Sequence, residues 1–186
     1  MVSSTLRSAV RWLAVLMLAA CAGSPASTGQ AGAPAPDTSG TLIGSTQGEG
    51  VQVALRLING DGSTPVVAAT FTPEQAGFHL YSVDLPERGI EGVGRPTRLQ
   101  VGGTLAAVST AVADQHVVWL HVAGIDSALP VYPDGAVTLR MPVRMVPGMG
   151  SARAPQAWVS YAACSSTACL PPVTHRPIDL RLPGAA

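Results

Sequence analysis

Apolar and polar side chains alternate along several short segments of this chain. In residues 51–57 every second residue is a Val or Leu, and the alternation recurs on either side of Pro142 in residues 137–145. Side chains of a β-strand point alternately to its two faces, so a period of two predicts strands with one buried face. Other short apolar runs predict strands at residues 65–71, 78–83, 95–101, 116–122, 158–163 and 178–182.

The run 116–122 differs from the others, because apolar residues occupy both phases around Trp119. A strand that is covered on both faces has this pattern. We therefore expect Trp119 and Trp158 to be core aromatic residues. Met141 and Met145 fall on the apolar phase of the segment 137–145 and are expected to fill gaps in the core.

The predicted strands imply an all-β fold. No segment keeps the 3.6-residue period of an amphipathic helix, and 20 glycines and 16 prolines supply frequent turn signals. Seven to nine short strands separated by turns are typical of an immunoglobulin-like antiparallel β-sandwich. We assign this domain to residues 46–186. The formal net charge of zero, without any basic cluster, excludes an ordinary nucleic-acid-binding surface.

The first twenty residues have the pattern of a signal peptide. Arg7 and Arg11 precede a short apolar stretch, and the sequence Leu-Ala-Ala-Cys ending at Cys21 resembles the lipobox of bacterial lipoproteins. The resemblance implies that the Cys21 thiol carries fatty acyl chains such as palmitate and that residues 1–20 are removed. An ordinary signal peptide with an incidental cysteine is the alternative.

The segment 21–45 is predicted to be a flexible tether. It is rich in Gly, Ala, Ser and Pro and has no large apolar side chain before Leu42, so it cannot bury enough surface to become ordered. With lipidated Cys21, the protein would be membrane-anchored in the cell envelope and face the periplasm or extracytoplasmic space. Ala22, in place of an aspartate, favours the outer membrane.

After lipidation of Cys21, only Cys164 and Cys169 remain of the three cysteines. An oxidising compartment favours their pairing. A disulfide across so short a loop stabilises the fold by only about 2 kcal/mol, and the neighbouring His175 and Arg176 would favour a thiolate if they lay close in space. The residues alone leave two interpretations open, a redox-active pair and a structural disulfide.

The segment around the cysteines resembles the active-site segment of the N-terminal periplasmic domain of thiol:disulfide interchange proteins of the DsbD type. The matching positions are Tyr161, Cys164, Cys169, Pro171, Pro172 and Thr174, and weaker similarity extends to residues 77–82 and 131–143. The resemblance implies an immunoglobulin-like sandwich that exchanges electrons with thioredoxin-like proteins and needs no cofactor. Cys169 would form the mixed disulfide and Cys164 would resolve it, while Tyr161, Pro171, Pro172 and Thr174 would support the redox loop.

The chain departs from that family in two respects. Four residues separate the cysteines, where the best-known members have five, and no acidic-aromatic loop that would cap the pair is recognisable. Electrons are expected to come from a separate protein.

The sequence is also compatible with two other functions. A non-catalytic envelope scaffold or binding lipoprotein would carry the same disulfide as a structural element. A soft-metal site, which the sequence favours less, would use residues from a set of methionines and histidines: Met141, Met145, Met149, His116, His121 and His175.

Overall fold

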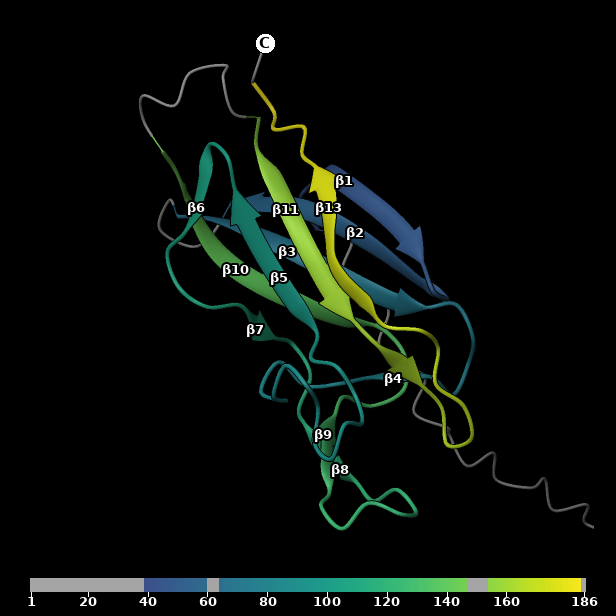
Figure 1. Ribbon diagram of the computed structural model, residues 1–186. Coiled ribbons are helices and arrows are strands. Elements are labelled where there is room, and N and C mark those ends of the chain that lie inside the picture. The colour runs from purple at the N-terminus through teal and green to yellow at the C-terminus, as the bar shows by residue number, and fades with distance from the viewer. Residues whose placement is uncertain (1–38, 60–63, 147–153, 185–186) are drawn as a thin grey trace, which may run out of the picture. The chain divides into compact units, whose positions relative to one another are not determined.

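The chain folds into antiparallel sheets that form the two layers of a sandwich (Figure 1). The computed structural model describes residues 39–59, 64–146 and 154–184, all within one unit that spans Gly32–Ala186. Every regular element of these ranges is a strand. Within them, no helix is long and apolar enough to cross a membrane.

The larger layer is a six-stranded sheet. Its order is β1-β2-β3-β10-β6, and β7 also pairs with β10. The strands are β1 (Thr41–Gly48), β2 (Val51–Asn59), β3 (Pro65–Pro73), β6 (Leu105–Ala107), β7 (Val112–Ala113) and β10 (Val137–Met145).

The smaller layer contains three strands in the order β13-β11-β5. They are β5 (Arg98–Gly102), β11 (Gln156–Tyr161) and β13 (Val173–Asp179), and in Figure 1 they lie in front of the larger sheet. Along β11 the residues Ala157, Val159 and Tyr161 are fully buried, whereas Trp158 and Ser160 between them are partly exposed. This alternation turns one face of the smaller sheet toward the core.

Two short ribbons lie at one end of the sandwich (Figure 1). One pairs β4 (His79–Leu80) with β12 (Ala163–Cys164), and the other pairs β8 (Val118–Leu120) with β9 (Leu129–Val131). An isolated bridge between Tyr81 and Val131 joins the two ribbons. This end of the fold has a small apolar cluster of its own, formed by Tyr81, Leu85, Leu129, Val131, Ala162 and Cys164.

The predicted all-β sandwich is confirmed. Seven of the thirteen strands in the described ranges have five or more residues, and the other six have two or three. The alternation in residues 51–57 corresponds to β2, in which Val51, Val53 and Leu55 are buried. The last long strand lies earlier than expected, since β13 ends at Asp179 and Leu180 is buried just beyond it.

The first described strand overlaps the predicted tether. Strand β1 begins at Thr41 and pairs with β2, and Ile43 is buried. Residues 41–45 therefore belong to the sheet rather than to a flexible segment. Residues 1–38, which include Cys21 and most of the predicted tether, lie outside the described ranges.

The prediction that Trp119 is a core residue is wrong. The residue is 67% exposed, and its neighbour Val118 is 46% exposed. Strand β8 pairs only with β9, at the end of the sandwich, so an apolar run of this kind does not by itself indicate a second covering layer. Met145, also expected in the core, is 54% exposed because it is the last residue of β10, whereas Met141 is buried as predicted.

Candidate functional site

Cys164 and Cys169 form a disulfide that crosses a tight hairpin. Their Cα atoms are 4.1 Å apart, and the two residues form an antiparallel bridge. Backbone hydrogen bonds flank the pair, from Ser165 N to Ala168 O (2.7 Å) and from Leu170 N to Ala163 O (2.9 Å). The cysteines thus occupy a non-hydrogen-bonded position of the ladder, where facing side chains approach most closely.

The tip of this hairpin has additional hydrogen bonds. Ser165 Oγ accepts from the backbone N–H of Thr167 (3.2 Å) and of Ala168 (3.1 Å). Such local side-chain bonds satisfy backbone donors that a four-residue loop would otherwise leave to water. The hairpin is therefore held by hydrogen bonds on both sides of the disulfide and does not depend on the S–S bond alone.

The two cysteines differ in their environment. Cys164 is only 3% exposed and belongs to the small apolar cluster, whereas Cys169 is exposed to solvent. A thiolate from another protein can therefore reach Cys169 more readily than Cys164, and attack there would leave Cys164 as the departing group.

Tyr81 contacts the buried cysteine. Its hydroxyl donates a hydrogen bond to Cys164 Sγ at 3.2 Å. Thr97 holds the Tyr81 backbone in place, because Thr97 Oγ1 donates to Tyr81 O at 2.7 Å. Burial raises the pKa of Tyr81 above its ordinary value, so the hydroxyl keeps its proton and remains a donor at neutral pH.

His79 lies next to this pair. It faces Cys164 across the β4–β12 ladder, and its ring packs edge-on against Tyr81 with a centroid distance of 5.8 Å. His79 Nδ1 is 3.8 Å from a carboxylate oxygen of Asp134.

A glycine-rich loop borders the disulfide. Residues 92–95, together with Ala162, Cys164, Cys169, Leu170 and Pro172, line a depression of about 270 Å³. Arg95 turns back onto its own loop, donating to the carbonyl oxygens of Arg88, Gly92 and Gly94. The loop thus lies beside the pair and leaves Cys169 exposed.

The other residues named from the sequence lie at different places. Tyr161 is buried in the main core and donates to Gly48 O at 2.8 Å. Pro171, Pro172 and Thr174 are exposed in the segment that leaves the hairpin and enters β13. Of these four, only Pro172 lines the depression beside the disulfide.

Neither basic neighbour of the cysteines in the sequence interacts with their sulfur atoms. The His175 ring stacks on Trp158 with centroids 5.4 Å apart, and Arg176 donates to Gln47 O at 2.8 Å. Tyr81 and His79 occupy the polar side of the pair instead. Sequence reasoning did not select them as site residues, although their period-two spacing places both on one face of the predicted strand 78–83.

The described ranges contain no group of three or more His, Cys, Asp or Glu side chains that could hold a metal ion. Met141 is buried, Met145 is exposed at a strand end, and His175 is stacked on Trp158. Met149 lies outside the described ranges.

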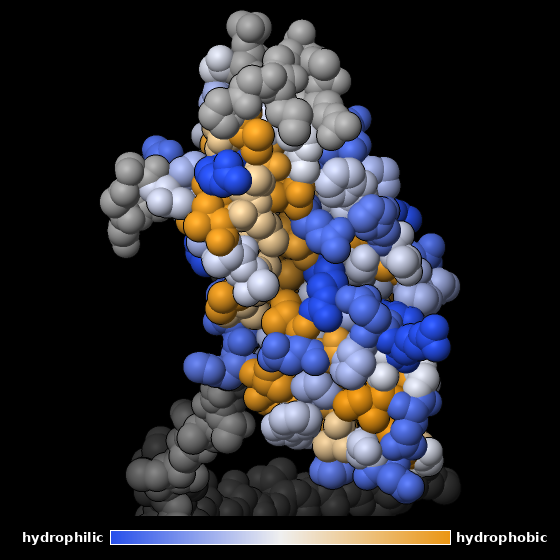
Figure 2. Space-filling model, turned by 60° about the vertical axis from the view of Figure 1, so that its left-hand side comes forward, coloured by the Kyte–Doolittle hydropathy of each residue, from blue (hydrophilic) through white to orange (hydrophobic). Residues whose placement is uncertain are grey.

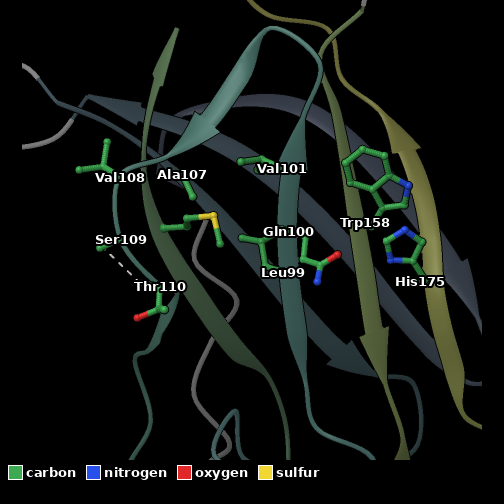
Figure 3. Close-up of a pocket in the computed structure, with 10 residues that line it drawn as sticks. Leu99, Gln100, Val101, Ala107, Val108, Ser109, Thr110, Trp158 and His175 are labelled. Carbon is green, nitrogen blue, oxygen red and sulfur yellow. Dashed lines mark hydrogen bonds between the residues drawn. The ribbon is translucent and has the colours of Figure 1, made fainter. Parts of the chain in front are cut away.

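A second hollow lies on another part of the sandwich. The side that comes forward in Figure 2, which carries β6 and β10, shows a strip of apolar side chains, and Val108, Val112 and Met145 on this side are exposed. A groove of about 460 Å³ lies nearby, between residues of β5, the segment after β6 and the Trp158–His175 stack (Figure 3). Its lining contains no Asp, Glu, Lys, Arg or Cys, so the disulfide remains the better candidate for chemistry.

The chain is similar to known proteins in structure but matches none in sequence. No family model and no curated protein matches the chain. Among solved structures, it is similar to the N-terminal periplasmic domain of ScsB from Proteus mirabilis. The TM-score is 0.46 and the sequence identity 14%, over 76% of this chain and 52% of that one. The matched region thus spans about half the length of that structure.

Proposed function

We propose that this protein performs thiol-disulfide exchange through Cys164 and Cys169, passing two electrons between a thioredoxin-like donor and an acceptor protein. The observation that carries the proposal is the asymmetry of the pair. The exposed Cys169 is open to attack, and the buried Cys164 has a hydroxyl donor, Tyr81, directed at its sulfur atom.

The exchange follows from this geometry. A thiolate of the donor attacks Cys169 Sγ, the S–S bond breaks, and the electron pair leaves with Cys164 Sγ. The Tyr81 hydroxyl stabilises the Cys164 thiolate through a charge-assisted hydrogen bond. The second donor thiol then attacks the donor's own sulfur in the mixed disulfide, which releases Cys169 as a thiolate and oxidises the donor.

Passing the electrons on reverses these steps. The Cys169 thiolate attacks the disulfide of an acceptor and forms a mixed disulfide. Cys164 then attacks Cys169 Sγ, which restores the intramolecular bond and releases the reduced acceptor. Cys169 is thus the residue that meets the partner, and Cys164 is the resolving residue.

A purely structural role for the disulfide is the competing interpretation. The bond closes a loop with a sequence separation of five, for which chain entropy supplies only about 2 kcal/mol. The hydrogen bonds of Ser165 and Leu170 already hold the same hairpin. A disulfide at this place adds little to a turn that is already closed, which favours the redox role.

We further propose that the protein is an envelope lipoprotein. Residues 1–20 would be the signal peptide, Cys21 the acylated residue, and residues after it a tether for the sandwich domain. An extracytoplasmic location supplies the oxidising surroundings in which an exposed disulfide persists. Globomycin-sensitive processing and labelling with radioactive palmitate in cells, both lost in Cys21→Ser, would test the anchor.

The experiment that tests the exchange is trapping of the mixed disulfide. Cys164→Ser is expressed in the envelope of the native organism, and adducts are sought on non-reducing gels. We expect adducts that disappear in Cys164→Ser/Cys169→Ser. Adducts with Cys169→Ser but not with Cys164→Ser would reverse the assigned roles, and no adduct with either variant would favour the structural role.

The reduction potential gives an independent measurement. A value of about −180 to −230 mV matches known exchange proteins, whereas one below about −300 mV is typical of structural disulfides. The second result would contradict the proposed function.

A further inference from the structure

Three buried groups gather on one side of the disulfide. His79 is 6% exposed, Tyr81 is 1% exposed and Cys164 is 3% exposed. His79 and Cys164 are paired across the antiparallel ladder, and residues paired in this way project their side chains from the same face of the sheet. The ring of His79 also contacts Tyr81, the donor to Cys164 Sγ.

His79 has a ring nitrogen without a partner. Nε2 is buried and makes no hydrogen bond, whereas Nδ1 is 3.8 Å from Asp134, whose side chain is 62% exposed. A neutral imidazole carries one proton, and a proton on Nδ1 faces the carboxylate and leaves the lone pair on Nε2. Burial lowers the pKa of His79 and Asp134 partly opposes this effect, so the ring is neutral at neutral pH while the disulfide is intact.

The titratable groups around His79 are few. Its own strand continues into Tyr81, β12 contributes Cys164, and the segment after β9 contributes Asp134 and Tyr132. The hydroxyl of Tyr132 is turned to Val83 N at 3.0 Å, and the positive charge of Arg98 acts on Tyr132 rather than on His79. Among these groups, only His79 can become a cation.

Reduction changes the charge at this place. When the S–S bond breaks, Cys164 takes the electron pair and becomes a thiolate in a site that is almost closed to water. A buried negative charge is costly unless it is paired and hydrogen-bonded. Tyr81 supplies one hydrogen bond and no charge.

We propose that His79 is a proton-accepting positioning residue for Cys164: it takes up one proton from solvent when Cys164 becomes a thiolate and releases that proton when the disulfide forms again. This inference rests on the proposed exchange function. When a thiol opens the disulfide, the site then holds a buried ion pair between the His79 imidazolium and the Cys164 thiolate. In the oxidised protein the same two groups are neutral. Reduction at neutral pH is thereby made easier than at a site without His79.

The test is a titration of the full chain by proton NMR, once oxidised and once reduced with a phosphine. The sequence contains four histidines, and the signal of His79 is identified by its absence in His79→Gln. We expect the protonated fraction of His79 at pH 7 to rise about fivefold or more on reduction, as expected next to a new opposite charge. Coincident titrations of the oxidised and reduced protein would overturn the proposal.

Two cysteine variants separate the thiolate from other effects of reduction. Cys169→Ser keeps a free Cys164 and should keep the high protonated fraction of His79, whereas Cys164→Ser removes the thiolate and should titrate like the oxidised protein. Equal titrations of the two variants would also overturn the proposal. If His79→Gln does not fold, the signal of His79 is identified as the one that remains when the other three histidines are replaced, in His116→Gln/His121→Gln/His175→Gln.

The same experiment separates this inference from the proposed function, because a phosphine reduces the protein without any partner. If His79 does not respond to reduction but thioredoxin still reduces the pair, the role of His79 is wrong and exchange stands. If His79 responds but thioredoxin cannot reduce the pair, the exchange function fails.

Discussion

From the hydrogen bond between Tyr81 and Cys164 we predict how removal of the Tyr81 hydroxyl changes the reduction potential of the disulfide. Tyr81→Phe removes the hydroxyl, which lies 3.2 Å from Cys164 Sγ, and keeps the buried ring. A hydrogen bond to a charged group contributes about 1.5–3 kcal/mol, against about 0.5–1.5 kcal/mol for one between neutral groups. In the proposed exchange Cys164 is a thiolate in the reduced protein, so the bond is expected to be stronger there.

The difference gives the expected magnitude. Removing the hydroxyl should disfavour the reduced state by about 1–2 kcal/mol, and about 1.4 kcal/mol corresponds to 30 mV for two electrons. The reduction potential of Tyr81→Phe should therefore be about 20–45 mV more negative than that of the natural protein. Equilibration with glutathione buffers at pH 7, followed by thiol labelling of the two cysteines, measures it.

Tyr161→Phe is the matched control. It removes the hydroxyl of another buried tyrosine, whose hydroxyl donates to Gly48 O in the main core and not to a sulfur atom. Its reduction potential should stay within measurement error of the natural value. An unchanged potential in Tyr81→Phe, or an equal change in both variants, would show that the hydrogen bond does not set the redox equilibrium.

Two further predictions concern stability. Gly94 has a φ of +81°, and a Cβ atom there would lie 2.6 Å from the Tyr81 ring; Gly94→Ala should cost about 2 kcal/mol or more in urea unfolding. Gly92 has a φ of +83°, and a Cβ atom there would have nothing within 4 Å, so Gly92→Ala should cost only the backbone strain. An equal loss of stability in both variants would disprove a clash with Tyr81. Burial lowers the pKa of His79 in the oxidised folded protein below its ordinary value of 6.5. As the pH falls below 6.5, the unfolded chain therefore binds a proton at His79 that the folded chain does not bind. The free energy of unfolding should thus fall as the pH drops below 6.5, and it should fall less in His79→Gln. Urea unfolding at a series of pH values measures this. The same dependence on pH in the natural protein and in His79→Gln would contradict the prediction.

Much of the fold could be predicted from the sequence, because alternation is a local signal. The long strands β2 and β10 have one buried face, and a period of two reports that face directly. Trp119 shows where this reasoning fails. Its burial depends on whether another layer covers β8, and no pattern within residues 116–122 encodes the position of that strand at the end of the sandwich.

The candidate site was only half predictable. The two cysteines are close in the sequence, and their pairing follows from that proximity. Tyr81 is 83 residues from Cys164 in the chain, and their contact depends on the pairing of the two-residue strands β4 and β12. The spacing of His79 and Tyr81 places both on one face of a predicted strand, but no local signal says which strand pairs with it, so the groups around the sulfur atoms become visible only in the folded structure.

The hydrogen-bonded hairpin has a kinetic consequence for any complex with a partner. Ser165 and Leu170 hold the two cysteine backbones in register without help from the S–S bond. In a mixed disulfide, Cys164 therefore stays beside Cys169 at an effective concentration well above the millimolar values of flexible tethers. In the proposed exchange, the lifetime of the adduct with an acceptor is therefore set by the attack of Cys164 and not by the diffusion of a second molecule.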